Sequence, residues 1–245
     1  MKNILILAGL LFLLVGCSNP GDCIESTGDI ITKEFSVSNF DKIIVYEGIG
    51  LVVTEGPEFK VEVKTGKNLM EGIEVKVTDS LLSLKDNITC NLVRDYGQTT
   101  VYVTAPNIIE LHSKTARTIS SNGILSYPIL RLFSIDLTDG IGTGDFNIQV
   151  NNEQTVVESN NIARYYISGQ TNDLQLYFYD GSGRFEGENI TAKTINIFHR
   201  SSNDLVVKPT ESITGKMVST GNVILKNTPP IVDVQQLYTG HVIYN

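Results

Sequence analysis

The feature that most constrains the fold is a short pattern that returns about every 20 residues through the second half of the chain. Small turn residues recur there at intervals of 19, 20, 20, 18 and 19 residues. They are Gly144, Ala163, Gly183, Asn203, Gly221 and Gly240. A strand–turn–strand unit repeated at such a period is typical of a solenoid, in which each coil stacks on its neighbour.

Two apolar columns run through the same alignment. The first consists of Phe146, Tyr165, Phe185, Leu205, Val223 and Val242. The second, two residues later, consists of Ile148, Ile167, Gly187, Val207, Leu225 and Tyr244. Because side chains alternate across a strand, columns two residues apart face the same side. We therefore expect both columns to point into a parallel β-helix, and we prefer this fold to a two-layer β-sandwich.

The column between these two begins polar and turns apolar toward the C-terminus. Its members are Asn147, Tyr166, Glu186, Val206, Ile224 and Ile243. It should face outward, and its apolar end suggests that the last coils are covered or associate with another surface. The corner glycines are expected to serve backbone conformations with φ > 0, which glycine adopts without a Cβ penalty.

The first half of the chain also alternates, in short β-branched runs closed by turn residues, which is strand chemistry. It repeats less clearly, and "EGPEFKVEVKTG" (55–66) indicates hairpins or wider coils leading into the solenoid. Residues 120–130 make one enlarged coil with a loop. The predicted fold class is all-β: a parallel β-helix with coils of about 20 residues, preceded by a hairpin-rich part of the same domain.

The start of the chain has the pattern of an export signal. A 12-residue apolar run, Ile4 to Val15, follows Lys2 and is shorter than the roughly 20 residues that a membrane-spanning helix needs. It ends in Leu14-Val15-Gly16-Cys17, which resembles the lipobox of bacterial lipoproteins and implies cleavage before Cys17 and lipid on it. The alternative is a conventionally cleaved secreted protein. The predicted division is signal peptide 1–16, lipidated cysteine and tether 17–34, and solenoid domain 35–245.

With Cys17 carrying lipid, Cys23 and Cys90 remain as a pair. An exported chain meets an oxidising compartment, so a disulfide between them is expected. Two buried thiols are the alternative. Neither cysteine has a partner at metal-ligand spacing, which disfavours a zinc site.

Composition and motifs exclude several classes of function. The net charge of −8 argues against binding to nucleic acid. "DGSGRFEG" (180–187) has the wrong spacing for a dinucleotide fingerprint, and the three histidines lack ligand spacing, so no cofactor or metal is expected. The chain has no tryptophan, which disfavours a sugar-stacking platform, although ten tyrosines could substitute.

The column directly after each corner is the most chemically suggestive set. It consists of Asp145, Arg164, Arg184, Asp204, Asn222 and His241. If the register holds, these side chains stack along one edge, either as a solvated ladder with weak cross-coil ion pairs or as part of a carbohydrate-active site. Asp145 and Asp204, three coils apart, would lie about 14 Å apart. That exceeds the roughly 6.5–9.5 Å of an inverting glycosidase.

Two other carboxyl pairs stay open on sequence alone, Asp180 with Asp204 and Asp136 with Asp139. No catalytic residue is assigned, and the column is kept as a candidate surface ladder. The aromatic runs "RYYIS" (164–168) and "LYFYD" (176–180) either offer a binding surface or pack inside, and the sequence does not decide between these.

Several segments resemble the head GIN domain family of auto-transporter adhesins. They are "CIESTGDI" (23–30), "FDKIIVYEGIGLVVTEG" (40–56), "NLMEGIEVKV" (68–77), "CNLVRDYGQTTVYVTAP" (90–106) and "DGSGRFEG" (180–187). The most distinctive block is C-N-x-V-R-x-Y, with Cys90, Asn91, Val93, Arg94 and Tyr96. The resemblance implies a β-helical fold on exported, often lipidated proteins of Gram-negative bacteria, without catalytic residues. The chain departs from the family at "SNNIAR" (159–164), where the family tends to have another glycine corner.

We expect an outer-membrane lipoprotein of the cell envelope of a Gram-negative bacterium, attached to the membrane through Cys17. It is predicted to bind a glycan or an envelope protein through its surface without catalysis. The alternative is a carbohydrate-active enzyme that uses the polar column, and a purely structural envelope component is a third reading. The sequence does not determine the oligomeric state.

Overall fold

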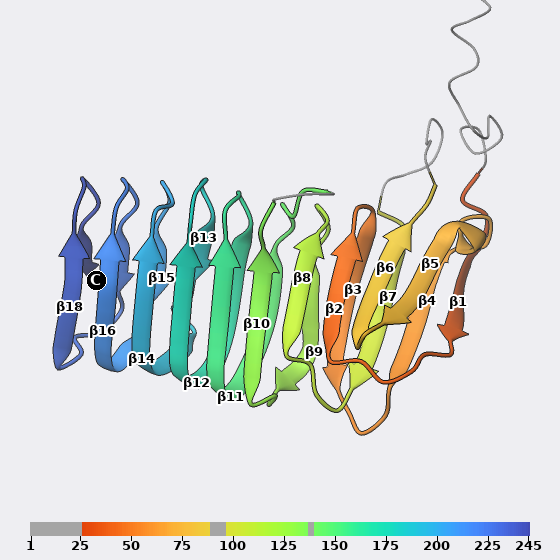
Figure 1. The fold of residues 1–245 in the computed structure, drawn as a ribbon, viewed down its shortest axis with the longest axis horizontal. Helices are drawn as coiled ribbons and strands as arrows, with labels where there is room; N and C mark the ends of the chain where they lie inside the picture. Colours follow the sequence, from red (N-terminus) through yellow and green to blue (C-terminus); the bar gives the residue numbers. More distant parts are fainter. Residues whose placement is uncertain (1–25, 89–96, 137–139) are drawn as a thin grey trace, which may run out of the picture.

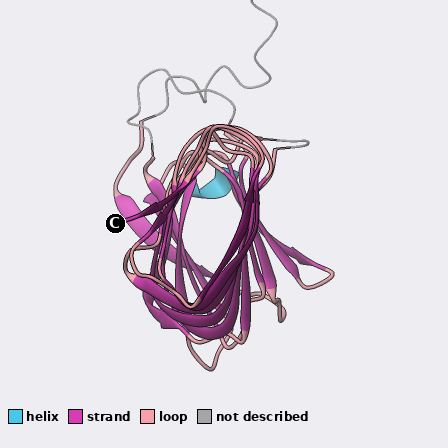
Figure 2. Cartoon of the chain, turned by 90° about the vertical axis from the view of Figure 1, so that its left-hand side faces the viewer, coloured by secondary structure: helices cyan, strands magenta, loops and turns pink. Residues whose placement is uncertain are grey.

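The computed structural model describes residues 26–88, 97–136 and 140–245, which form a long β-solenoid (Figure 1). Viewed along the solenoid, the coils superimpose into a flattened ring (Figure 2). The predicted parallel β-helix is thereby confirmed. Cys17, Cys23 and Cys90 lie outside the described residues, so lipidation and the disulfide remain predictions. No helix in the described part of the chain is long and apolar enough to cross a membrane.

The N-terminal part consists of short strands and one 3-10 turn, η1, which lies between β4 and β5. Its elements are β1 (Ile30–Phe35), β2 (Lys42–Tyr46), β3 (Ile49–Glu55), β4 (Lys60–Gly66), η1 (Met70–Gly72), β5 (Ile73–Thr78), β6 (Leu81–Asp86), β7 (Thr99–Ala105), β8 (Glu110–Lys114), β9 (Ile119–Leu125) and β10 (Ile129–Ser134). The regular coils follow. Their strands are β11 (Phe146–Ser159), β12 (Arg164–Phe178), β13 (Arg184–Glu186), β14 (Ile190–His199), β15 (Leu205–Val207), β16 (Pro209–Met217), β17 (Val223–Leu225), β18 (Ile231–Gln236) and β19 (Val242–Tyr244).

The strands form two long parallel ladders on opposite sides of the flattened coil. Face A runs β6-β2-β8-β10-β11-β12-β14-β16-β18, and face B runs β7-β3-β9-β11-β12-β13-β15-β17-β19. The long strands β11 and β12 bend and contribute to both faces. Each regular coil therefore supplies one rung to each face.

The predicted register of the repeats is confirmed on face B. Phe146 pairs with Tyr165, Tyr165 with Phe185, and the first column continues through Leu205 to Val223 and Val242. The side chains from Phe146 to Val223 in this column are fully buried. The coil that links Ile119 to Phe146 is longer than the others, as predicted. It carries a register shift between β9 and β11, between Asn147 and Gln149.

The sequence pattern correctly placed glycines at the corners, but the expected reason, a positive φ, is wrong. Gly144 and Gly221 do not have positive φ. A Cβ on Gly144 would lie 2.0 Å from the Arg117 carbonyl oxygen, and one on Gly221 would lie 2.1 Å from that of Asn203. Glycine recurs at these corners because the backbones of successive coils approach each other too closely for a side chain.

At "SNNIAR", where the sequence departs from the glycine pattern, Asn161 makes the corner. Its side-chain oxygen accepts a hydrogen bond from the Ala163 amide at 2.9 Å. Its side-chain amide donates to the Ser134 carbonyl at 3.0 Å and to Asp136 Oδ2 at 2.9 Å. The side chain therefore satisfies the backbone of its own turn and ties it to the preceding coil.

The N-terminal part contains the expected antiparallel pairings and one crossover that the sequence did not indicate. β4 pairs antiparallel with both β1 and β7, and β5 pairs antiparallel with β6. The coil made by β2 and β3 lies between the β6–β7 coil and the β8–β9 coil. The earliest coil is thus inserted between two later ones (Figure 1). β1 begins inside the 17–34 segment that was assigned to the tether and ends at Phe35, the first residue of the predicted solenoid domain.

Candidate functional site

The six residues of the predicted polar column stand at successive rungs beside face B. Arg184 Nη1 donates to Asp204 Oδ2 at 3.3 Å. Asp204 Oδ1 accepts from both the backbone and the side-chain amide of Asn222, each at 3.0 Å. The next rung continues the chain of bonds, because the His241 backbone amide donates to Asn222 Oδ1 at 3.1 Å.

Arg184 is also bonded within its own rung, where Nε contacts the Glu186 carboxylate. This hydrogen bond, together with the charge of Asp204, raises the pKa of Arg184 above its ordinary value. At the other end of the column, Asp145 and Arg164 make no side-chain hydrogen bond to the described residues. From Arg184 to His241 the polar groups of the column satisfy one another.

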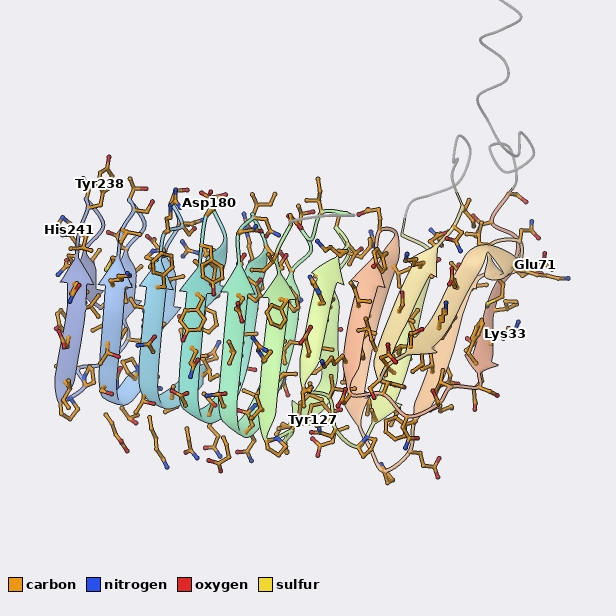
Figure 3. The ribbon with its side chains drawn as sticks, viewed as in Figure 1. Lys33, Glu71, Tyr127, Asp180, Tyr238 and His241 are labelled. Atoms are coloured by element: carbon orange, nitrogen blue, oxygen red, sulfur yellow. The ribbon has the colours of Figure 1, made fainter. Side chains whose placement is uncertain are left out.

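The other carboxylates of the enzyme hypothesis take part in local turns. Asp136 Oδ1 accepts from the Gly142 amide at 2.9 Å, and Asp180 Oδ1 accepts from the Gly181 amide at 2.9 Å. Asp180 lies at the tip of a coil (Figure 3). Asp139 lies outside the described residues. Asp136, Asp180 and Asp204 therefore each stabilise a corner or a neighbouring rung.

The two aromatic runs are divided by the pleat of the strands. Tyr165 is fully buried, whereas Tyr166 is 40% exposed on the outside of face B. On face A, Phe178 is buried, and Tyr177 and Tyr179 point outward with their rings stacked, 6.3 Å between centroids. Each run therefore supplies both core and surface, which resolves the alternative that the sequence left open.

The aromatic rings outside face A contact one another and neighbouring cations. Tyr179 also packs against Phe198, 5.9 Å between centroids. Lys216 Nζ lies 5.3 Å from the Phe198 ring, and the Arg131 guanidinium lies 4.6 Å from the Phe133 ring. These rings are thus packed against neighbouring rings and cations, although Tyr179 keeps 39% of its surface exposed.

A hollow of about 590 Å³ lies on the outside of face B. We call it the face B groove. Its lining comes from β9, β11, β12 and β13 and from the turn between β13 and β14. It consists of Ser120, Ser121, Asn147, Ile148, Gln149, Tyr166, Ile167, Ser168, Glu186, Glu188 and Asn189. The volume falls in the usual range of small-molecule sites, about 300–1,000 Å³.

The groove differs from the polar column in that most of its polar side chains are free. Six of them make no hydrogen bond or ion pair with any residue of the described ranges. These six are Asn147, Gln149, Tyr166, Ser168, Glu188 and Asn189. Free donors and acceptors around one exposed ring are available to a ligand, whereas the groups of the column are already paired.

A second hollow, of about 470 Å³, lies at the neighbouring corner and is entirely polar. Its side chains are largely paired across the coils. Gln170 Nε2 donates to Asn151 Oδ1 at 2.8 Å, and Asn172 donates to the Glu153 carboxylate. These bonds stabilise the stacking of β11 on β12, so the face B groove is the stronger candidate for binding.

Sequence patterns identified only some of the groove residues. Asn147, Tyr166 and Glu186 were recognised as an outward column, but nothing marked them as a site. Glu188 and Asn189 follow β13, outside the aligned columns. One signal could have located the site. It is the combination of the first three members of the outward column, Asn147, Tyr166 and Glu186, with the polar turn that precedes β14.

Comparisons with known proteins give a family match and similar solved structures. A model of the family described as "Putative auto-transporter adhesin, head GIN domain" matches residues 39–229. No curated protein sequence matches the chain. The crystal structure of a protein described as a putative adhesin from Bacteroides fragilis is similar at a TM-score of 0.80 and 19% identity, covering 90% of this chain and 100% of its own.

Two structures from Parabacteroides are also similar. A putative adhesin from Parabacteroides merdae has a TM-score of 0.62 at 12% identity and covers 89% of this chain and 98% of its own. A protein described as a putative lipid binding protein from Parabacteroides distasonis has a TM-score of 0.65 at 13% identity, with 89% and 99% covered. At these identities the likeness shows a shared fold alone.

Proposed function

The chain belongs to the family described as "Putative auto-transporter adhesin, head GIN domain", and we propose that it is an adhesion-type module of the cell envelope. In this proposal lipid on Cys17 attaches the module to the outer membrane of a Gram-negative bacterium, and a disulfide joins Cys23 to Cys90. The module acts by binding, and the face B groove holds the ligand.

The observation that carries the proposal is the contrast between paired and free polar groups on one side of the solenoid. The polar column from Arg184 to His241 is bonded to itself. The groove beside it has free amides, a free carboxylate and an exposed tyrosine ring. Such a lining offers a polar ligand several hydrogen-bond partners and one aromatic contact.

One experiment tests both attachment and binding. Wild type, Cys17→Ala and Tyr166→Ala chains are produced in a Gram-negative host supplied with radiolabelled palmitate, solubilised, and passed over immobilised bacterial surface polysaccharide. We expect label on wild type and Tyr166→Ala but not on Cys17→Ala. Retention should fall about tenfold in Tyr166→Ala, which loses about 1.4 kcal/mol of contact energy. Cys17→Ala should be retained like wild type.

Tyr102→Ala is the matched control, because Tyr102 is 38% exposed, close to the 40% of Tyr166, and lies outside the groove. Its retention should equal that of wild type. Label that persists on Cys17→Ala would refute the lipid anchor. Equal retention of Tyr166→Ala and Tyr102→Ala would refute the groove as the binding site.

A further inference from the structure

We infer that the ligand of the face B groove is a neutral, hydroxyl-rich glycan that lies on the Tyr166 ring and follows the solenoid axis. The inference rests on the proposed function and specifies its ligand. Tyr166 has Asn147 on the adjacent rung to one side and Glu186 on the rung to the other. Ser168, two residues further along the same strand, faces the same side of the sheet.

The lining favours a glycan over a peptide. Peptides commonly bind to a β-sheet by adding a strand to a free edge or by inserting apolar side chains into pockets. The groove offers no free edge, because β11 and β12 are hydrogen-bonded in ladders on both sides. The two aliphatic lining residues, Ile148 and Ile167, are each only 1% exposed, so no apolar pocket is open.

The charges of the lining favour a neutral ligand. No lysine or arginine is among the groove residues. Glu188 is an exposed carboxylate without a partner in the described part of the chain, and Glu186 is already paired with Arg184. Arg164, which is unpaired within the described residues, lies on the same side of β12 as Tyr166, just outside the lining, and Asp145 stands level with it on the adjacent rung. An anionic polymer would therefore meet a net negative surface here, and the chain as a whole carries a net charge of −8.

The arrangement of the groups favours an extended ligand. The free amides of Asn147 and Asn189 both donate and accept hydrogen bonds, as neighbouring sugar hydroxyls do. The lining spans four successive rungs of face B, from Ser120 through Asn147 and Tyr166 to Glu186. At a strand spacing of about 4.8 Å this is about 14 Å, enough for a short oligosaccharide.

The test uses the full chain in a zwitterionic detergent and measures affinity by calorimetry. The probes are neutral oligosaccharides and uronate-containing oligosaccharides of the same length. We expect binding of at least one neutral probe and none of the uronate probes. Tyr166→Ala should weaken the neutral probe about tenfold or more. Asn189→Ala should weaken it about threefold to tenfold through loss of a hydrogen bond.

Tyr166→Phe keeps the ring and should bind within about threefold of wild type, because it loses at most one hydrogen bond. Tyr102→Ala controls for a general effect of removing an exposed tyrosine and should not change affinity. Stronger binding of uronate probes than of neutral ones would overturn the inference. So would neutral binding that Tyr166→Ala leaves unchanged.

The failure of this inference is distinguishable from the failure of the proposed function. If retention on surface polysaccharide depends on Tyr166 but neutral probes neither bind nor compete, the groove is a binding site for another class of ligand and the glycan assignment is wrong. If no retention depends on Tyr166, the proposed site itself is wrong.

Discussion

The two ends of the solenoid differ: antiparallel strands close the N-terminal end, and the last described rungs leave the C-terminal end open. At the N-terminal end, β1 and β4 extend face B with antiparallel strands, and β5 lies antiparallel along face A. At the C-terminal end, within the described chain, β18 pairs with β16 alone and β19 with β17 alone. Lys33 and Glu71 mark the first end and Tyr238 and His241 the second (Figure 3).

The difference is visible in the core columns and in the charges. Leu225 is fully buried, but Tyr244, the next residue in the same column, is 56% exposed. The two outermost N-terminal strands, β1 and β4, carry charges, and Lys60 Nζ of β4 lies 3.0 Å from Glu62 Oε2 of the same strand and 3.7 Å from Glu34 Oε2 of β1. Charged residues on an edge oppose pairing with other strands. β18 carries one charge, at Asp233.

The difference shows that stacking buries the core of the inner coils on both sides and that of an end coil on one side only. Each coil is covered by the next one. A side chain of the same column is therefore buried where a further coil packs on it and exposed on the last described rung. At the N-terminal end the antiparallel strands β1, β4 and β5 cover the β6–β7 coil instead. The following predictions test how far the influence of the open end extends.

The largest expected effect separates two neighbours in one column. Leu225→Ala should lower the free energy of unfolding by about 2–5 kcal/mol, because it leaves a cavity in a closed part of the core. Tyr244→Ala, one rung further, should change it by less than about 0.5 kcal/mol, as is usual for surface substitutions. Urea denaturation of both variants measures the difference. Similar losses would mean that the last coil is covered in solution.

The next prediction uses His199, which is fully buried two rungs inside the open end on face A. Burial lowers its pKa from the ordinary 6.5 to about 4. The unfolded chain therefore takes up a proton below about pH 6.5 and the folded chain only near pH 4. The free energy of unfolding should fall by about 3 kcal/mol as pH drops across this window.

His199→Met supplies the control, because Met217 occupies the next position in the same column. The difference in unfolding free energy between wild type and this variant should be constant above pH 6.5 and change by about 3 kcal/mol between pH 6.5 and pH 4. A histidine that titrates near 6.5 would show that the open end admits water as far as β14.

A smaller effect is expected at the closed end. Thr65 and Thr99 are buried and share a hydrogen bond of 2.8 Å between their hydroxyl oxygens. Thr65→Val should cost about 1–3 kcal/mol, because it leaves the Thr99 hydroxyl buried without a partner. The double variant Thr65→Val/Thr99→Val should recover most of this loss. Additive losses in Thr65→Val, Thr99→Val and the double variant would show that the two hydroxyls are not coupled.

Local chemistry made the regular coils predictable. Phe146, Tyr165 and Phe185 recur at nearly constant spacing, and each must be buried in the same way, so their register follows from the period. The face B groove was predictable only in part. Asn147 and Tyr166 belong to the repeat, but Asn189 lies in a turn, and its place in the groove, next to Gly169, depends on where the coil closes.

The sequence by itself determined the alternation of strands, the coil length and the residues of the regular core, because these depend on periodic burial along the chain. The tertiary structure alone decided the insertion of β2 and β3 between later coils, the side to which each tyrosine of an aromatic run points, and the reason for the corner glycines. It also decided which polar groups pair with each other and which remain free. All of these depend on contacts between coils, and such contacts link residues that are not adjacent in the sequence.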